Sequence, residues 1–278
     1  MNSDKQFRSN TIKVLTKYFI RNIAFRFESW FLFVSVLLIF SGFTINALRS
    51  VAKDMFIVTS NIYEQPIFAG VLFVCVFSSF LQMLHISRDI DSRIYESYLY
   101  GPVDESSYII SIFVSYSLMN CVAVFVLPLL WITAVYLLAG IPVTAAAVLQ
   151  ILIGYVLSNL ILTIAMCIGA LAKKSKLALW YLLLFHVVCI GIILGNTVIS
   201  TYLVPVKRTD VDVFSFFRVV SQSLYDASVY FSPYTQFYIL QKNFSYGILP
   251  VVLICAAFAA GQVLFGFLSR WLFKRSVL

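Results

Sequence analysis

The chain has 278 residues, of which 61% are hydrophobic and only 12% are charged, and its formal net charge is +8. A mean hydropathy of +0.94 excludes a water-soluble protein that hides its apolar side chains in one core, and it indicates a protein whose solvent is the lipid bilayer. The basic balance requires no nucleic acid, because membrane topology and anionic lipid headgroups account for it.

The N-terminal residues 1–29 are polar and basic, and they predict a helix with two different faces. The basic face carries Lys13, Lys17 and Arg21, and the apolar face carries Leu15, Phe19 and Ile23. We therefore expect an amphipathic helix that lies in the membrane interface, either as a simple anchor or as a structural elbow before the first span.

The rest of the chain, 30–278, contains six long uncharged apolar runs, each of which is long enough for a transmembrane helix. The runs are 30–48, 66–86, 108–138, 142–172, 177–203 and 247–269. The predicted fold class is therefore an all-α integral membrane protein with six spans. The third and fourth runs would each measure roughly 46 Å as straight helices, which exceeds the hydrocarbon core of about 30 Å. They must tilt, bend or project, and Pro128 predicts a bend in the third.

The distribution of Lys and Arg predicts the orientation of the spans. Fourteen of the 20 basic residues fall on the side that holds both termini, the loop after the second span and the loop after the fourth. That side is predicted to be cytoplasmic, and the membrane to be the inner (cytoplasmic) cell membrane. The long segment 204–246 is then external. Within it, 213–224 predicts a helix on or dipping into the outer leaflet, and 231–234 predicts a break.

The apolar runs carry none of the residues that membrane enzymes and ion-coupled carriers use, since they contain no Asp, Glu, Lys or Arg. His85 and His186 stand alone and are interpreted as hydrogen-bonded packing residues. The chain has no phosphate-binding loop, nucleophile motif or metal-ligand spacing. We expect no catalytic site, no metal and no cofactor in this chain, and packing roles for the five cysteines.

Six amide side chains lie within the apolar runs. They are Asn46, Gln82, Asn120, Gln150, Asn159 and Asn196. Each residue has two interpretations, because an intramembrane amide can form a hydrogen bond between helices or can line a weakly polar pathway. Asn46, Gln82, Asn120, Asn159 and Asn196 are the candidate pathway residues.

The one dense polar segment is the predicted cytoplasmic loop 87–107, which holds five of the 12 acidic residues. Asp89 and Arg93 stand four residues apart, which supports the start of a short helix there. The sequence Tyr100-Gly101-Pro102 ends that helix, because Gly and Pro do not sustain it. Asp104 and Glu105 follow where carboxylates favour the first turn of the third span. The loop would present a short helix, parallel to the membrane, to a soluble partner.

This segment resembles the cytoplasmic coupling loop of ABC type-2 export permeases. The resemblance rests on Asp89-Ile-Asp91, Glu96-Ser-Tyr98-Leu99, Gly101-Pro102-Val103 and the layout of the whole chain. That layout is an N-terminal amphipathic helix, six spans, a longer external segment before the sixth and a basic tail. The chain departs from the family where Ile94-Tyr95 stands in place of a common Gly-Thr pair.

The resemblance implies the transmembrane subunit of an exporter that lacks its own ATPase. Two such subunits, identical or paralogous, would assemble with two nucleotide-binding ATPase proteins, which would bind the ATP and Mg. The residues that would contact the ATPase are Asp89, Asp91, Arg93, Glu96, Tyr98, Leu99, Gly101, Pro102 and Val103. The family exports several classes of substrate, so the cargo stays open.

Two other function classes are compatible with the same residues. An ATP-independent secondary carrier or channel would require a charged or ion-coordinating site within the spans, and the apolar runs show none. A non-transporting membrane scaffold or sensor component would use the polar loop as a docking site. A membrane enzyme has the least support, because its chemistry is missing.

Overall fold

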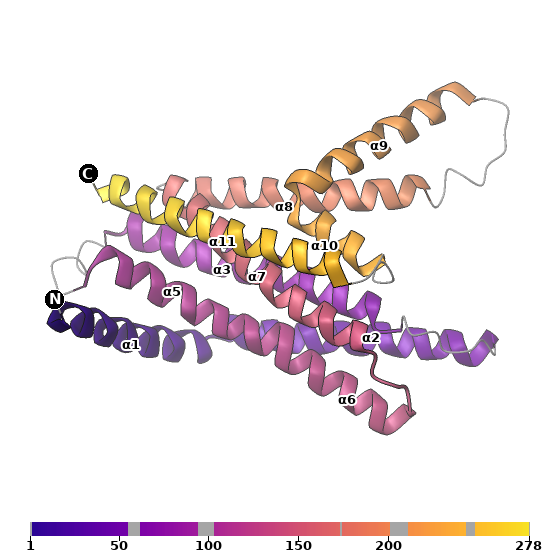
Figure 1. The fold of residues 1–278 in the computed structure, drawn as a ribbon, viewed down its shortest axis with the longest axis horizontal. Helices are drawn as coiled ribbons and strands as arrows, with labels where there is room; N and C mark the ends of the chain where they lie inside the picture. Colours follow the sequence, from indigo (N-terminus) through magenta and orange to yellow (C-terminus); the bar gives the residue numbers. More distant parts are fainter. Residues whose placement is uncertain are drawn as a thin grey trace. The chain divides into compact units, whose positions relative to one another are not determined.

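The computed structural model describes residues 2–54, 62–93, 103–172, 174–200, 211–242 and 248–277, and within them the ordered elements are all helices (Figure 1). They are α1 (Asn2–Ala24), α2 (Phe27–Asp54), α3 (Glu64–Asp91), α5 (Glu105–Asn120), η1 (Cys121–Val126), α6 (Leu127–Ala139), α7 (Ala145–Ala172), α8 (Ser175–Val198), α9 (Val211–Phe231), α10 (Pro233–Lys242) and α11 (Ile248–Val277).

Six helical segments are long and apolar enough to cross a membrane, which confirms the six predicted spans. They are Phe27–Asn46, Glu64–Asp91, Glu105–Ala139, Ala145–Ala172, Ser175–Val198 and Val251–Arg275. Several helices continue beyond the apolar run that predicted them. The largest extension that bears on function is at the end of α3, which runs to Asp91 instead of stopping at residue 86.

The chain divides into two compact units. Unit 1 comprises Met1–Leu179 and Cys255–Leu278, and unit 2 comprises Trp180–Ile254. In unit 1, α3 packs along α7, which is buried for most of its length. Gly154 allows this close approach, because a Cβ atom there would lie 2.6 Å from Cγ2 of Val71.

The third span is interrupted by a π-helical turn, η1, immediately before Pro128. Proline has no N–H to donate to the carbonyl of Val124, four residues earlier, and its ring would crowd that carbonyl in a regular helix. A wider turn at residues 121–126 accommodates both effects. The distortion predicted at Pro128 therefore takes this form. The helix α6 then ends at Ala139, and its C-cap residue Gly140 has a left-handed φ of 67°.

The fourth span begins at Ala145, three residues later than the predicted run. The Thr144 hydroxyl caps it by accepting a hydrogen bond from the N–H of Ala147 at 3.2 Å. The loop before it is tied to the start of α3, because the Tyr63 hydroxyl donates to the carbonyl of Ile141 at 3.3 Å. Burial raises the pKa of the Tyr63 phenol above its ordinary value.

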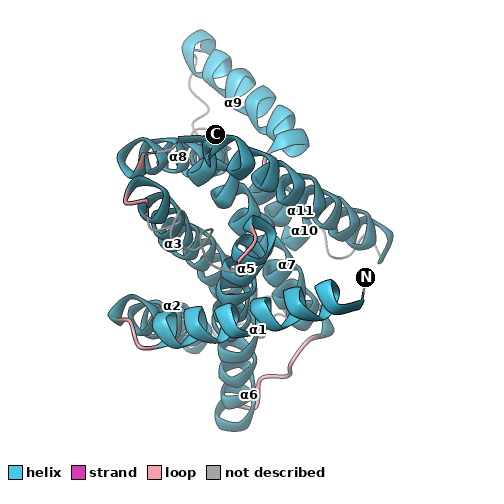
Figure 2. Cartoon of the chain, turned by 90° about the vertical axis from the view of Figure 1, so that its left-hand side faces the viewer, coloured by secondary structure: helices cyan, strands magenta, loops and turns pink. Residues whose placement is uncertain are grey.

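The N-terminal helix α1 packs against α5, and Figure 2 shows it lying across the front of the bundle. Leu15, Phe19 and Ile23 are buried. The predicted basic face is exposed at Lys13, Lys17 and Arg21. The position of this helix in a membrane interface stays a prediction.

Serine side chains at every fourth position of α5 let α1 approach closely. Ser111 and Ser115 are buried, and their hydroxyls lie 3.3 Å from the carbonyl of Ile12 and 3.4 Å from that of Thr16. Each hydroxyl also lies near the carbonyl one turn earlier in α5, at 2.6 and 2.7 Å. Small hydroxyl residues are typical of tight helix contacts in membranes.

In unit 2, α9 is longer than the predicted helix 213–224, and Ser232 separates it from α10, as the predicted break at 231–234 requires. The hydroxyl of Ser228 lies 2.9 Å from that of Thr235 and joins the two helices. His186 is buried and its Nδ1 lies 2.9 Å from the Tyr234 hydroxyl, which agrees with its interpretation as a hydrogen-bonded packing residue.

Candidate functional site

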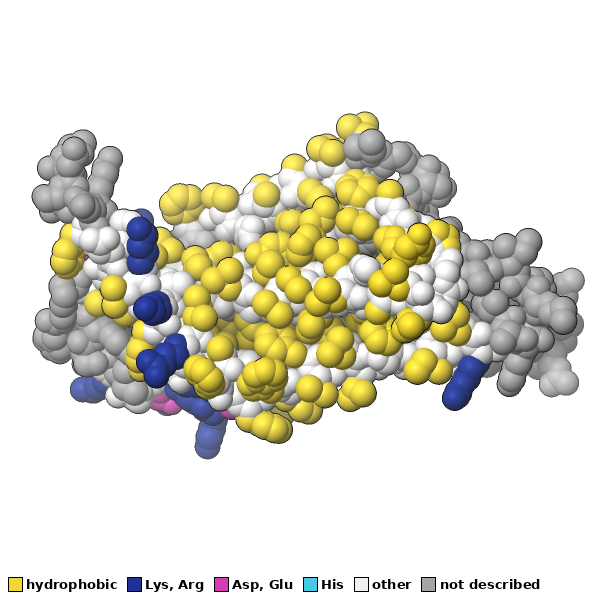
Figure 3. Space-filling model, turned by 90° about the horizontal axis from the view of Figure 1, so that it is seen from below, with side chains coloured by type: hydrophobic (Ala, Val, Ile, Leu, Met, Phe, Trp, Pro, Cys, Tyr) yellow, Lys and Arg dark blue, Asp and Glu magenta, His cyan; other side chains and the backbone are white. Residues whose placement is uncertain are grey.

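The end of unit 1 at which α3 ends, α5 begins and α11 ends is rich in exposed basic side chains, and we call it the basic end. Its exposed basic residues include Arg8, Arg88, Arg93, Arg270, Lys274 and Arg275. Figure 3 shows Lys and Arg gathered toward this end, next to a broad hydrophobic surface. The segment 94–102, which contains the predicted coupling helix, lies outside the described residues.

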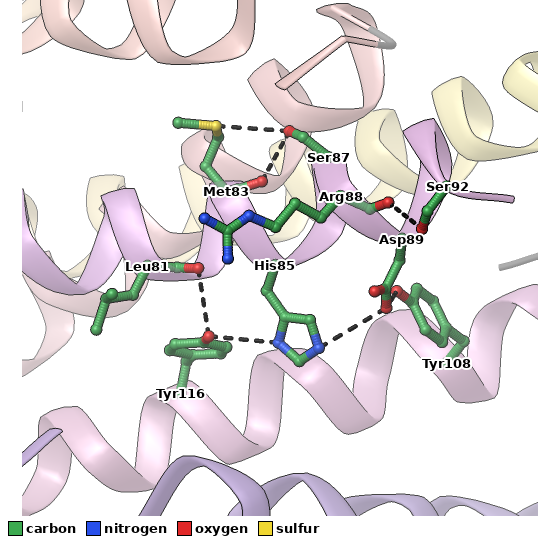
Figure 4. Close-up of polar contacts among 9 residues, drawn as sticks. All are labelled: Leu81, Met83, His85, Ser87, Arg88, Asp89, Ser92, Tyr108 and Tyr116. Carbon is green, nitrogen blue, oxygen red and sulfur yellow. Dashed lines mark hydrogen bonds and ion pairs between the residues drawn. The ribbon is translucent and has the colours of Figure 1, made fainter. Parts of the chain in front are cut away.

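The last two turns of α3 bring an imidazole and a carboxylate together inside the basic end (Figure 4). His85 and Asp89 are four residues apart on one helix face, and the distance from His85 Nε2 to Asp89 Oδ2 is 3.7 Å. Their side chains are only 9% and 12% exposed. A pair so close and so shielded from water interacts more strongly than the same pair at a surface.

Two tyrosines of α5, two helical turns apart, complete this polar cluster. The Tyr108 hydroxyl donates to Asp89 Oδ2 at 2.5 Å. The Tyr116 hydroxyl lies 3.3 Å from His85 Nδ1 and 3.3 Å from the carbonyl of Leu81. We call His85, Asp89, Tyr108 and Tyr116 the buried relay. It joins α3 to α5 at two points.

The hydroxyl of Tyr116 in the buried relay can donate to either of two acceptors. A phenol has one hydrogen to donate, and the Tyr116 hydroxyl faces both the Leu81 carbonyl and His85 Nδ1. If the hydrogen goes to Leu81, the contact with His85 is a hydrogen bond only when Nδ1 carries a hydrogen and donates it to the phenol oxygen. If the hydrogen goes to Nδ1, the hydrogen of a neutral imidazole lies on Nε2 and faces Asp89. The relay therefore has two internal arrangements with the same heavy atoms.

Aromatic side chains from two further helices cover the buried relay. Phe19 of α1 packs edge-on against His85 and Tyr108, with ring centroids 5.4 and 6.0 Å apart. Phe273 of α11 packs against Tyr108 at 6.2 Å. Both phenylalanines are almost completely buried. The relay is therefore the meeting point of α1, α3, α5 and α11, all within unit 1.

Polar contacts tie both flanks of the segment 94–102 to the bundle. On one side, Asp89 contacts α5, and Asp91 accepts a hydrogen bond from the Ser175 hydroxyl at 3.3 Å. On the other side, Asp104 occupies the N-cap position of α5, accepts from the Ser107 hydroxyl and lies 3.6 Å from Nη2 of Arg8. The Arg8 pair is largely exposed, so it contributes at most about 1 kcal/mol.

The predicted coupling residues separate into two groups. Asp89, Asp91, Arg93 and Val103 are described, whereas Glu96, Tyr98, Leu99, Gly101 and Pro102 lie outside the described residues. The expected start of a new helix at Asp89 is wrong, because α3 continues to Asp91. Arg93 then has a left-handed φ of 55°, as is common just beyond a helix C-terminus. The carboxylate of Asp89 points into the bundle. There its Oδ2 atom accepts a hydrogen bond from the Tyr108 hydroxyl and lies 3.7 Å from His85 Nε2.

The candidate pathway residues differ in their surroundings. Gln82 and Asn120 are buried with no hydrogen-bond partner for either amide atom among the described residues, and the same holds for the Oδ1 atom of Asn159. These three come from α3, α5 and α7, which pack together. Asn46 lies on an exposed part of α2, and Asn196 of unit 2 accepts from the Ser221 hydroxyl at 3.3 Å.

Sequence reasoning did not identify Tyr108 and Tyr116 as site residues and treated His85 as an isolated residue. A local signal was available, because His85 and Asp89 have the spacing of one helical turn and the tyrosines have the spacing of two. Among the described residues, no group of three or more His, Cys, Asp and Glu side chains converges as metal ligands would.

Comparison with models of known protein families and with curated proteins found no match to this chain.

Proposed function

We propose that this chain is the permease subunit of an ATP-binding cassette exporter, in which a separate ATPase drives the spans through the segment between α3 and α5. The observation that carries the proposal is the 2.5 Å hydrogen bond from Tyr108 to the buried carboxylate of Asp89. It joins the last turn of the helix before that segment to the first turn of the helix after it.

This contact supports the transmission of force. A hydrogen bond to a buried charged group contributes about 1.5–3 kcal/mol, more than an exposed ion pair does. A push on the segment would therefore move the ends of α3 and α5 together instead of spreading them apart. Since α3 packs along α7, the central helix of unit 1 would follow.

The proposal includes the remaining expectations. The basic end would face the cytoplasm, as the distribution of Lys and Arg favours. The partner ATPase would bind the ATP and Mg, and a second permease copy or a paralogue would complete the pathway. The six spans and the absence of charged residues from the middle of the apolar runs support a pathway driven from outside the membrane.

The direct test is purification of the full tagged chain from its own source membranes in mild detergent. We expect a protein with nucleotide-binding motifs to co-purify, and the charge reversal Glu96→Lys to release it. The matched control is Arg49→Glu, an equal charge reversal at an exposed position of α2 that is predicted to face outside. Absence of any such ATPase, or its retention in Glu96→Lys, would contradict the proposal.

One observation favours a second candidate, a proton-coupled carrier that needs no ATP. The buried His85–Asp89 pair is an ionisable pair of the kind that such carriers use, and it lies within the second candidate span. Transport into sealed vesicles distinguishes the two candidates. Loss of transport with a proton ionophore but not with ATP depletion favours the carrier, and the opposite result favours the ATP-driven exporter.

A further inference from the structure

The helix α11 contacts the rest of unit 1 along one stripe of its surface. Phe258, Ser269 and Phe273 on this stripe are buried. Gly261 approaches Leu160 of α7, and the Cys167 thiol of α7 lies 3.0 Å from the carbonyl of Phe265. The neighbouring stripe of α11 does not reach α5 or α7 in the same way, and a groove follows it.

This groove has a volume of about 480 Å³, within the range of about 300–1,000 Å³ that is common for ligand sites. Its walls are α5, α7 and α11, and most of its lining is apolar. The apolar lining residues include Ile109, Ile110, Phe113, Met166, Val263 and Phe267. A surface of this kind inside a membrane-spanning bundle favours an acyl chain.

The groove is lined by one charged side chain, Arg270, and by three uncharged polar ones, Ser106, Thr163 and Gln262. Arg270 and the hydroxyl of Ser106 line it where α5 begins and α11 ends, which is the basic end. Arg270 is exposed and has no ion-pair partner among the residues that the structure describes. Asp104, the N-cap residue of α5, contacts Arg8 instead.

We propose that this groove binds one anionic phospholipid of the leaflet at the basic end, with its phosphate at Arg270 and an acyl chain between α5, α7 and α11. The dimensions agree with this occupant. The α11 residues that line the groove, 262–270, span about 12 Å. One leaflet contributes about 15 Å to the hydrocarbon core, so the groove extends from headgroup depth to near the bilayer centre.

The arrangement of charge also selects a lipid over a helix from a second copy. The groove has a guanidinium at one end only, and the other residues that line it carry no charge. An amphiphile with one anionic end matches that polarity. The proposal does not depend on the ATP-driven function, since a carrier or a scaffold could hold the same lipid.

The test fills the groove or removes its charge in the full-length protein. Gly266 lines the groove, and a Cβ atom there meets nothing within 4 Å, so Gly266→Phe should occupy the acyl-chain space without a clash at the backbone. Arg270→Gln should remove the phosphate contact. The readout is native mass spectrometry of delipidated protein titrated with dioleoylphosphatidylglycerol or with dioleoylphosphatidylcholine.

We expect wild-type protein to retain one phosphatidylglycerol more strongly than phosphatidylcholine. Arg270→Gln should lower that preference by roughly fivefold, the effect of one basic side chain near a lipid surface, while Arg270→Lys keeps most of it. Gly266→Phe should remove the retained lipid of either kind.

Two variants serve as matched controls. Gly191→Phe adds the same side chain on α8 at a glycine whose added Cβ also meets nothing within 4 Å. Lys274→Gln removes an exposed charge from the same end of α11, one turn beyond Arg270. Unchanged lipid binding in both Gly266→Phe and Arg270→Gln would overturn the proposal. A change of oligomeric state in Gly266→Phe with lipid binding intact would overturn it too, because the groove would then be an interface between copies.

Discussion

At the scale of single residues, the polar groups inside the bundle are of two kinds. The polar groups of the buried relay have hydrogen-bond partners, since Asp89 accepts a hydrogen bond from Tyr108 and His85 lies within hydrogen-bond distance of Tyr116. The side-chain amides of Gln82 and Asn120 have no hydrogen-bond partner among the described residues. A buried polar group without a partner costs about 1–3 kcal/mol, so the two kinds should respond in opposite directions to substitution.

Tyr108→Phe should destabilise the protein by about 1–3 kcal/mol, because it removes the strongest contact of a buried carboxylate and keeps the ring. The measurement is the thermal unfolding midpoint in detergent. Tyr136→Phe is the control, since Tyr136 is 50% exposed and should change little. Equal midpoints for the two variants would show that the hydrogen bond to Asp89 does not hold the basic end together.

Gln82→Met should raise the stability by about 1–2 kcal/mol, because it replaces two unpartnered amide atoms by an apolar side chain of similar size. Unfolding midpoint and transport should be measured on the same preparation. Higher stability with lower transport would mark Gln82 as a pathway residue, and lower stability would show that its amide is paired in the native protein.

At the scale of elements, small residues decide which helices lie close together. Gly154 lets α7 contact α3, and the serines of α5 let α1 contact α5. A helix glycine without such a neighbour has no packing role, and in a helix it costs about 0.5–1 kcal/mol relative to alanine. The structure therefore separates glycines and serines that matter for packing from those that do not.

Gly154→Ala should destabilise the bundle by about 1–3 kcal/mol, because the added methyl group would lie 2.6 Å from a branched carbon of Val71. Gly191→Ala is the matched substitution in a helix with open space, and it should be neutral or stabilising by up to about 1 kcal/mol. Chemical or thermal unfolding of the pair measures the difference. A Gly154→Ala variant as stable as Gly191→Ala would contradict the close packing of α3 and α7.

Ser111→Leu should detach α1 from α5, because its hydroxyl lies 3.3 Å from the backbone of Ile12 and a branched side chain does not fit there. Limited proteolysis in detergent measures the release of α1. Thr133→Leu is the control on the exposed surface of α6. Protection of α1 that is unchanged in Ser111→Leu would contradict a role for this contact in holding the helix.

At the scale of the whole molecule, the six spans followed from the sequence because each depends only on an uncharged run of sufficient length. The end of α3 did not, because burial of Asp89 depends on Tyr108, which is 19 residues away and on another helix. The distortion at Pro128 was expected, but the π turn that precedes it was not. No prediction from the sequence concerns the two compact units, since they reflect contacts between distant segments.

The predicted orientation is testable on whole cells with a membrane-impermeant maleimide. Arg49→Cys should be labelled directly, because its side of the membrane carries the fewer basic residues. Lys274→Cys should be labelled only after permeabilisation. Both positions are exposed in the structure, so accessibility within the protein does not bias the comparison. The reverse labelling pattern would place the basic end outside the cell and contradict the proposed function.

The contact between α1 and α5 has a consequence for how the chain is made. Ser111 and Ser115 lie 99 residues beyond the carbonyls that they approach. At about 5–20 residues per second, a ribosome needs roughly 5–20 s to synthesise that interval. During this time the apolar side chains of the N-terminal helix lack their main docking surface, which is α5. The nascent protein must shelter them against lipid or a chaperone until the third span has been inserted.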